Sequence, residues 1–120
     1  MSRRVAIYGL YDPADWRRRI RYVGKTTSPS RRLAQHIDRA FDEDSDKALW
    51  IRRLLARRRR PCMRILAWTT ERSWRRVERA WIARGRRRGW PLLNETDGGD
   101  GPGRQRQRTV LSLLRGVLNS

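Results

Sequence analysis

The feature that most constrains this 120-residue chain is the order in which its hydrophobic periodicity changes. Apolar residues alternate over Arg4–Tyr11, which is the two-residue period of a strand. Residues 19–24 have a similar pattern, with Ile20 and Tyr22 expected on one face. The turn-forming segment DPADW separates these two runs, so we expect them to pair as an antiparallel hairpin.

Helical periodicity follows in three later segments. Ser28 before Pro29 is a typical helix start, and it predicts a helix over residues 29–41 whose apolar row ends at Phe41. An acidic run at residues 42–46 precedes a second helix, whose buried stripe is expected to hold Trp50, Ile51, Leu54 and Leu55. A third helix is predicted over residues 71–88, ending near Gly89.

A short apolar run, CMRILAWTT, lies between the second and third helices and predicts a third strand. The expected fold is therefore α+β, with a small three-stranded antiparallel sheet flanked by helices. We assign residues 1–101 to one domain and residues 102–120 to a basic tail with a short amphipathic helix. That tail helix has three candidate roles: packing on the domain, forming a homodimer or gripping DNA.

The charge of the chain is strongly unbalanced. It has 30 basic and 12 acidic residues, a net charge of +18, and only Lys25 and Lys47 among the basic residues are lysines. Arginine binds phosphate oxygens in a planar fork, so nucleic acid is the favoured partner and an anionic membrane the weaker alternative. A base composition that favours arginine codons would explain the arginine-to-lysine ratio but not the net charge.

Several classes of protein are excluded by what the sequence lacks. One cysteine, Cys62, and one histidine, His36, are too few for a zinc finger or an internal disulfide. Any catalytic metal would then be a hard ion on carboxylates, such as Mg²⁺ or Mn²⁺. The N-terminal segment does not have the pattern of a signal peptide, and no apolar run approaches the length of a membrane span, so we expect a cytoplasmic protein with no membrane partner.

Three groups of polar side chains are candidates for chemistry. Glu78 falls on the apolar stripe of the third predicted helix, either as a carboxylate neutralised by an arginine or as a metal ligand. Arg32 and His36 lie four residues apart on one side of the first helix, where they are able to face one phosphate. Tyr8 and Tyr22 lie on neighbouring strands, a placement that packing alone would explain.

Taken together, these residues resemble the GIY-YIG nuclease family. AIY at residues 6–8 and YVG at residues 22–24 are similar to its two tyrosine motifs, and Arg32 and His36 have its spacing on the first helix. ExxWI at residues 78–82 is similar to its glutamate helix, and Asn94 to its late asparagine. The resemblance covers residue 5 to about residue 101. Ala6 departs from it by replacing a glycine, and DPADWRRR by lengthening the link between the tyrosines.

The resemblance implies an endonuclease that hydrolyses phosphodiester bonds of duplex or branched DNA with Mg²⁺ or Mn²⁺. It implies that Glu78 holds the metal, Arg32 stabilises the phosphorane charge and Tyr8 is the base. Tyr8 would need nearby cations to lower its pKa or a partner to take its proton, and Lys25, Arg32 and His36 are the candidates. Tyr22 would contact the water or phosphate, and Asn94 would buttress the site. The alternative is a non-catalytic basic nucleic-acid binder that keeps the fold.

Overall fold

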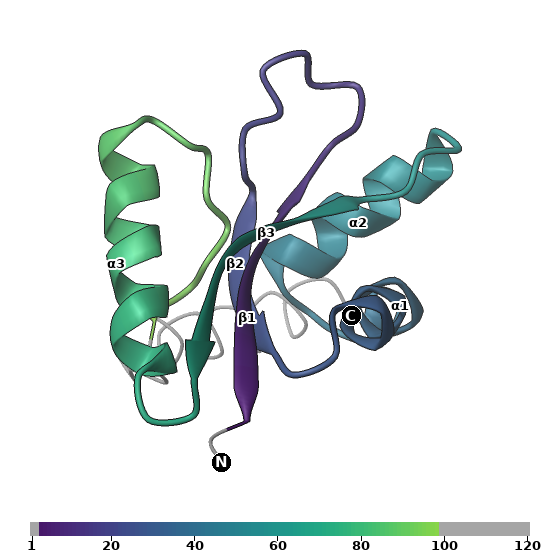
Figure 1. Ribbon diagram of the computed structural model, residues 1–120. Coiled ribbons are helices and arrows are strands. Elements are labelled where there is room, and N and C mark those ends of the chain that lie inside the picture. Colours follow the sequence, from purple (N-terminus) through teal and green to yellow (C-terminus); the bar gives the residue numbers. More distant parts are fainter. Residues whose placement is uncertain (1–2, 99–120) are drawn as a thin grey trace, which may run out of the picture.

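The structure, a computed structural model, describes residues 3–98 of the chain. Its elements follow the order β1 (Arg4–Tyr11), β2 (Tyr22–Thr26), α1 (Pro29–Arg39), α2 (Asp46–Ala56), β3 (Cys62–Thr70) and α3 (Trp74–Arg87) (Figure 1). The three strands form one antiparallel sheet, so the predicted α+β class is confirmed. The predicted tail helix and the boundary at residue 101 lie outside the described residues.

The sheet has the order β2-β1-β3, so β1 is its central strand and β2 one of its edges. In the register of β1 with β2, Tyr8 is opposite Gly24 and Leu10 is opposite Tyr22. Six consecutive residues of β1, 5–10, are buried, because helices cover both faces of the sheet. Paired residues of neighbouring strands share a face of the sheet, and so do residues two apart on one strand. Tyr8, Gly24 and Tyr22 therefore lie on the same face of the sheet.

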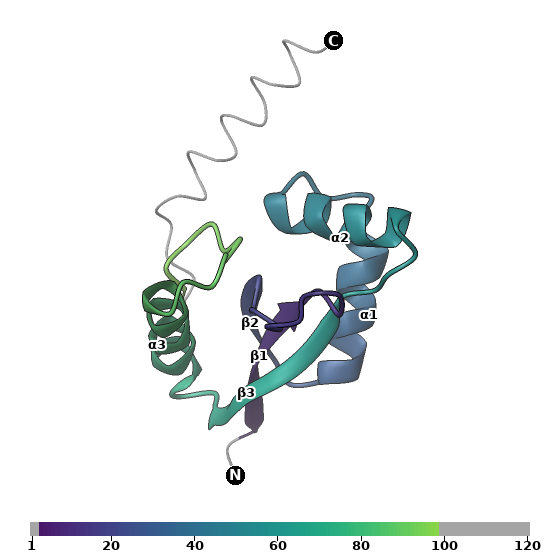
Figure 2. The same cartoon turned by 90° about the horizontal axis from the view of Figure 1, so that it is seen from above.

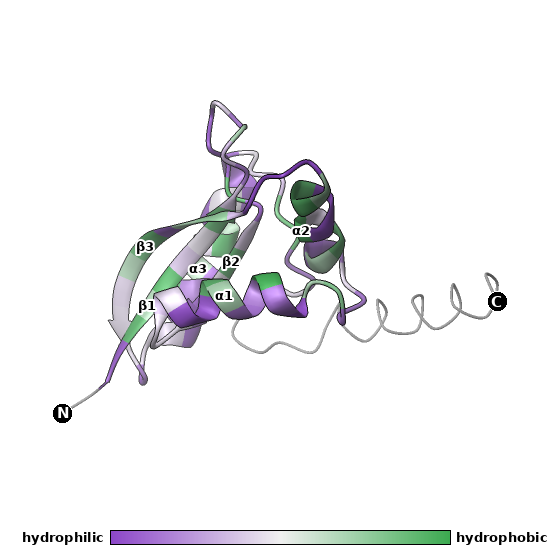
Figure 3. Cartoon of the chain, turned by 90° about the vertical axis from the view of Figure 1, so that its right-hand side faces the viewer, coloured by the Kyte–Doolittle hydropathy of each residue, from purple (hydrophilic) through white to green (hydrophobic). Residues whose placement is uncertain are grey.

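The helices form two layers around this sheet. Figures 1 and 2 show α3 on one side of the sheet and α1 with α2 on the other. On the α3 side the core contains Val5 and Ile7 of β1 packed with Trp74 and Ile82 of α3. The outward surface of α1 is mostly hydrophilic (Figure 3), as expected for a helix that buries a single face.

The predicted second strand begins too early. The structure starts β2 at Tyr22, and Ile20 lies in the preceding loop, where it joins the α3-side core instead of sharing a face with Tyr22. The cause is a turn in which Asp15 accepts hydrogen bonds from two backbone N–H groups and Arg18 adopts a left-handed φ of 50°. That turn reverses the chain before the strand period can begin.

Two helix limits also differ from the prediction. Helix α1 ends at Arg39, so Phe41 lies beyond it and is 68% exposed, not part of the buried row. Residues 71–73 form a turn, and α3 begins at Trp74. At its other end α3 stops just before Gly89, whose φ of 80° is the left-handed conformation that ends a helix, as predicted.

No helix within residues 3–98 is long and apolar enough to cross a membrane.

Candidate active site at the edge of β2

The two motif tyrosines and the motif glycine meet through the register of β1 and β2. Tyr8 is fully buried, and its ring lies over its cross-strand neighbour, Gly24. A Cβ atom at Gly24 would lie 2.5 Å from the Tyr8 hydroxyl oxygen and 2.6 Å from Cζ. Only glycine therefore leaves room for this ring. The Tyr22 ring lies beside it, with the two ring centroids 6.4 Å apart.

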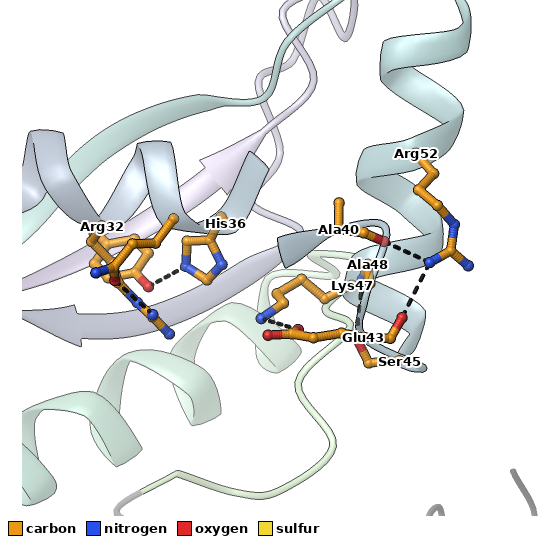
Figure 4. Close-up of polar contacts among 10 residues, drawn as sticks. Arg32, His36, Ala40, Glu43, Ser45, Lys47, Ala48 and Arg52 are labelled. Atoms are coloured by element: carbon orange, nitrogen blue, oxygen red, sulfur yellow. Dashed lines mark hydrogen bonds and ion pairs between the residues drawn. The ribbon is translucent and has the colours of Figure 1, made fainter. Parts of the chain in front are cut away.

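A short hydrogen bond joins Tyr8 to the first helix. The Tyr8 hydroxyl lies 2.6 Å from Nε2 of His36, which is 3% exposed (Figure 4). The His36 ring also meets the Tyr22 ring nearly edge-on, with centroids 5.5 Å apart. One turn earlier on α1, Arg32 donates a hydrogen bond to Gln35 Oε1 at 3.2 Å and lines the same cavity as Tyr8. Helix α1 thus brings a cation and an imidazole to the neighbourhood of one phenol.

Burial decides the protonation of this pair. It raises the pKa of the Tyr8 hydroxyl well above its ordinary value, and the Tyr22 hydroxyl adds to the shift, against an opposing effect of Arg32. Burial also lowers the pKa of His36 to about 3, assisted by the positive charges of Lys47 and Arg32. Both side chains are therefore neutral at pH 7. The sequence left open whether nearby cations lower the pKa of Tyr8 or a partner takes its proton. Arg32 does not bring this pKa below its ordinary value, because desolvation outweighs its effect.

Helix α3 brings the carboxylate of Glu78 to the opposite face of the sheet, beside β2. Glu78 is 8% exposed and lies on the stripe with Trp74 and Ile82, as its position in the helical period predicts. Trp74 in turn lies under the ammonium group of Lys25, whose Nζ is 4.5 Å from a ring centroid. This cation–π contact orients Lys25, an exposed residue of β2, toward α3.

The segment after α3 binds the free edge of β2. The Asn94 side chain accepts a hydrogen bond from the Val23 N–H at 2.9 Å and donates one to the Val23 carbonyl at 2.8 Å. The Leu93 N–H donates to the Arg21 carbonyl at 2.6 Å. These bonds replace those of a missing neighbouring strand and hold β2 in place. Asn94 therefore supports β2 from its free edge.

The start of α2 contributes a third cation. Lys47 Nζ lies 3.3 Å from a Glu43 carboxylate oxygen (Figure 4). It also lies 5.0 Å from the centroid of the Tyr22 ring. Burial lowers the pKa of Lys47, and Glu43 opposes that shift. Arg52 fixes the segment that carries Glu43, because its guanidinium donates to the carbonyls of Ala40 and Glu43. The position of Lys47 is thus set by a local network.

These groups surround one cavity of about 450 Å³. Six of the seven residues predicted as site residues line it: Tyr8, Tyr22, Lys25, Arg32, Glu78 and Asn94. The seventh, His36, lies behind Tyr8 and reaches the cavity through their hydrogen bond. Both faces of the sheet contribute, because β2 is a short edge strand and the helical layers meet beyond it.

Sequence reasoning missed five polar residues of the cavity wall: Glu43, Ser45, Lys47, Glu95 and Thr96. The acidic run at residues 42–46 favours the start of a helix, and Ser45 does accept a hydrogen bond from the Ala48 N–H at the start of α2. One signal was available. The only two lysines among 30 basic residues, Lys25 and Lys47, both line this cavity.

The acidic, histidine and cysteine side chains of the site determine whether it fits the metal that the family resemblance implies. Among residues 3–98 there is no group of three or more His, Cys, Asp or Glu side chains placed to share a metal ion. Mg²⁺ nevertheless binds proteins through one or two carboxylates and keeps several waters. A buried Glu78 carboxylate beside a polar cavity of about 450 Å³ fits that mode of binding. It does not fit zinc, which needs three or four protein ligands.

Comparisons with protein-family models, with curated proteins and with solved structures found no match to this chain. The geometry of the cavity is therefore the basis for the function proposed below.

Proposed function

We propose that this protein is a cytoplasmic, divalent-metal-dependent endonuclease that hydrolyses DNA phosphodiester bonds in the cavity beside β2. The observation that carries the proposal is the convergence of the hydrogen-bonded Tyr8–His36 pair, Arg32 and the buried Glu78 on one cavity. These are the residues on which the chain resembles the GIY-YIG nucleases. The net charge of +18 supports a polyanionic substrate.

In this proposal Tyr8 and His36 accept the proton of the attacking water. The neutral His36 ring has one nitrogen without a proton, and Nε2 takes that role when Nδ1 carries the hydrogen. As the water oxygen bonds to phosphorus, its proton passes to the Tyr8 oxygen and the Tyr8 proton passes to Nε2. The bond to the leaving oxygen breaks, and that oxygen is protonated by solvent. Tyr22 contacts the water or the phosphate.

Three cations from three elements are assigned to the phosphate. Arg32 comes from α1, Lys25 from β2 and Lys47 from α2, and all three line the cavity. The added negative charge of the phosphorane is stabilised most by donors already in place, because no rearrangement is needed during the reaction. Arg32 is assigned the main role since its planar guanidinium can grip two phosphate oxygens.

Glu78 is assigned to hold Mg²⁺ or Mn²⁺. A metal ion bound there would act as a Lewis acid that neutralises charge on the leaving oxygen. Glu78 also separates this proposal from a non-catalytic nucleic-acid binder. A carboxylate in the middle of a phosphate-binding cavity opposes binding unless a cation joins the two.

The decisive experiment incubates the Glu78→Gln variant with plasmid and branched DNA, with Mg²⁺ and with a chelator. We expect the wild type to cut only with the metal, and the variant to cut neither substrate while binding DNA as tightly or more tightly. Glu71→Gln is the matched control, since it removes the same charge from an exposed position before α3. Wild-type cleavage by a folded Glu78→Gln variant would refute the assignment, and an inactive wild type that still binds DNA would favour the binder.

A further inference from the structure

The connection between β1 and β2 presents a tryptophan to solvent. Trp16 is 82% exposed, and the guanidinium of Arg17 lies 4.8 Å from a centroid of its ring system. Figures 1 and 3 show residues 12–21 projecting beyond the end of the sheet, and Figure 3 colours most of this loop as hydrophilic. Core packing does not explain an indole in this position, and Trp16 does not line the cavity to which cleavage is assigned.

This loop has a defined shape. Asp15 accepts hydrogen bonds from the backbone N–H of Arg17 at 3.0 Å and of Arg19 at 3.2 Å, and it forms an ion pair with the Arg19 side chain at 3.1 Å. At the base of the loop, Asp12 pairs with Arg59, which follows α2, at 3.2 Å. A loop held at its tip and at its base loses little entropy when it binds a ligand. Trp16 is thus presented on an ordered support.

The chemistry of the tip matches an unpaired nucleobase. Exposed indole rings stack on bases that have left a duplex, and arginines beside them contact the flanking phosphates. Arg17, Arg18 and Arg19 follow Trp16 directly, and all three are exposed. A paired base inside a duplex has both faces covered by its neighbours, so the ring selects for nucleotides that are unpaired.

The position of the loop links it to the candidate active site. Trp16 is six residues before Tyr22 in the sequence, so an extended chain would separate them by at most about 20 Å. Successive nucleotides of one strand rise by about 3.4 Å, so that reach corresponds to roughly six nucleotides. One DNA molecule is able to contact both places.

We infer that the Trp16 loop, residues 12–21, is a second nucleic-acid site that stacks an unpaired base close to the position of cleavage. The protein then prefers DNA with unpaired nucleotides to an uninterrupted duplex. This inference rests on the proposed DNA substrate, but it does not depend on cleavage and is tested by binding alone.

The test measures the binding of two fluorescently labelled DNAs by anisotropy, in a chelator so that no cleavage occurs. One DNA is a short duplex, and the other is the same duplex with a run of unpaired nucleotides at its centre. We expect the wild type to bind the interrupted duplex about tenfold more tightly, a ratio equivalent to about 1.4 kcal/mol and within the range for stacking one base. Trp16→Ala should bind both DNAs with the same affinity, without weaker binding to the plain duplex. Trp16→Phe should keep part of the preference for the interrupted duplex.

Trp68→Ala on β3 is the matched control, because Trp68 is 48% exposed and also lies under an arginine, Arg4, at 4.4 Å. This variant should keep the wild-type ratio. The inference is overturned if Trp16→Ala keeps the ratio, if Trp68→Ala loses it equally, or if the wild type binds both DNAs with one affinity. The last result leaves the proposed function standing, whereas failure to bind either DNA ends both proposals. Binding of the wild type but not Trp16→Ala to phosphatidylserine vesicles, with no preference between the DNAs, would instead make the loop a membrane contact.

Discussion

The hydroxyl of Tyr8 on β1 lies 2.6 Å from Nε2 of His36 on α1, and both side chains are buried. Neither carries a charge at pH 7, because burial raises the pKa of Tyr8 and lowers that of His36. The pair is therefore a neutral hydrogen bond in the free protein. In the proposed reaction it becomes the path by which a proton leaves the attacking water.

Tyr8→Phe tests that path by removing one oxygen and keeping the ring. We expect cleavage to fall by at least about 100-fold, the usual effect of losing a general base. The free energy of unfolding should fall by about 1–3 kcal/mol, because His36 loses its buried partner. Plasmid cleavage and thermal melting, measured at a temperature where both proteins are folded, separate these effects. A variant that cuts at the normal rate would return Tyr8 to a packing role.

The lowered pKa of His36 predicts that acid destabilises the fold. Unfolded His36 titrates near pH 6.5, whereas in the folded protein its pKa is about 3. Between these values the unfolded state binds more protons, so the stability contribution is complete above pH 6.5 and declines as the pH falls. From pH 7 to pH 5 the loss should be about 2 kcal/mol.

Urea unfolding of the wild type and of His36→Gln at pH 7 and pH 5 measures this term. Most carboxylates stay ionised above pH 5, so the difference between the two proteins isolates His36. The variant should show the smaller change in its unfolding free energy. Equal changes in the two proteins would mean that His36 is not held neutral by the fold.

Arg32→Lys tests whether the phosphate needs a planar fork. An ammonium keeps the charge but loses the paired donors, so we expect a large fall in cleavage with little change in stability. Ile82→Ala is the opposite case, since Ile82 is fully buried on α3 one turn after Glu78. It should cost about 2–5 kcal/mol of stability and leave the site residues present. Full activity in Arg32→Lys would reduce Arg32 to a simple positive charge.

Gly24→Ala tests the space beneath the Tyr8 ring. The new Cβ atom would lie 2.5 Å from the Tyr8 hydroxyl oxygen, so the buried ring must move away from His36. We expect a loss of about 1–3 kcal/mol in stability, as for other overpacked sites, together with a loss of cleavage. Gly89→Ala is the control, because its φ of 80° strains an alanine but no atom lies within 4 Å of its Cβ. It should lower the melting temperature and leave cleavage intact.

The excess of arginine predicts how DNA binding responds to salt. With a net charge of +18, affinity for duplex DNA should fall steeply as salt displaces phosphate contacts, with little dependence on base sequence. Fluorescence anisotropy over a series of salt concentrations gives the slope. A flat response would contradict an interface dominated by phosphates.

The sequence by itself determined the order of the elements and much of the candidate site. Period-two alternation identified β1, and helical spacing placed Glu78 on a buried stripe, because both periods depend only on neighbours along the chain. The same spacing placed Arg32 and His36 on one side of α1. All seven residues predicted for the site line the cavity or, in the case of His36, contact a residue that does.

Only the tertiary structure decided the properties that depend on contacts between distant segments. The turn at Asp15 moved Ile20 into the opposite core, and α2 brought Lys47 against the Tyr22 ring. The protonation of Tyr8 was also undecided in the sequence, which left open whether cations lower its pKa or a partner takes its proton. Burial raises that pKa, because the cost of desolvating a charge depends on everything packed around it and not on the spacing of residues along the chain.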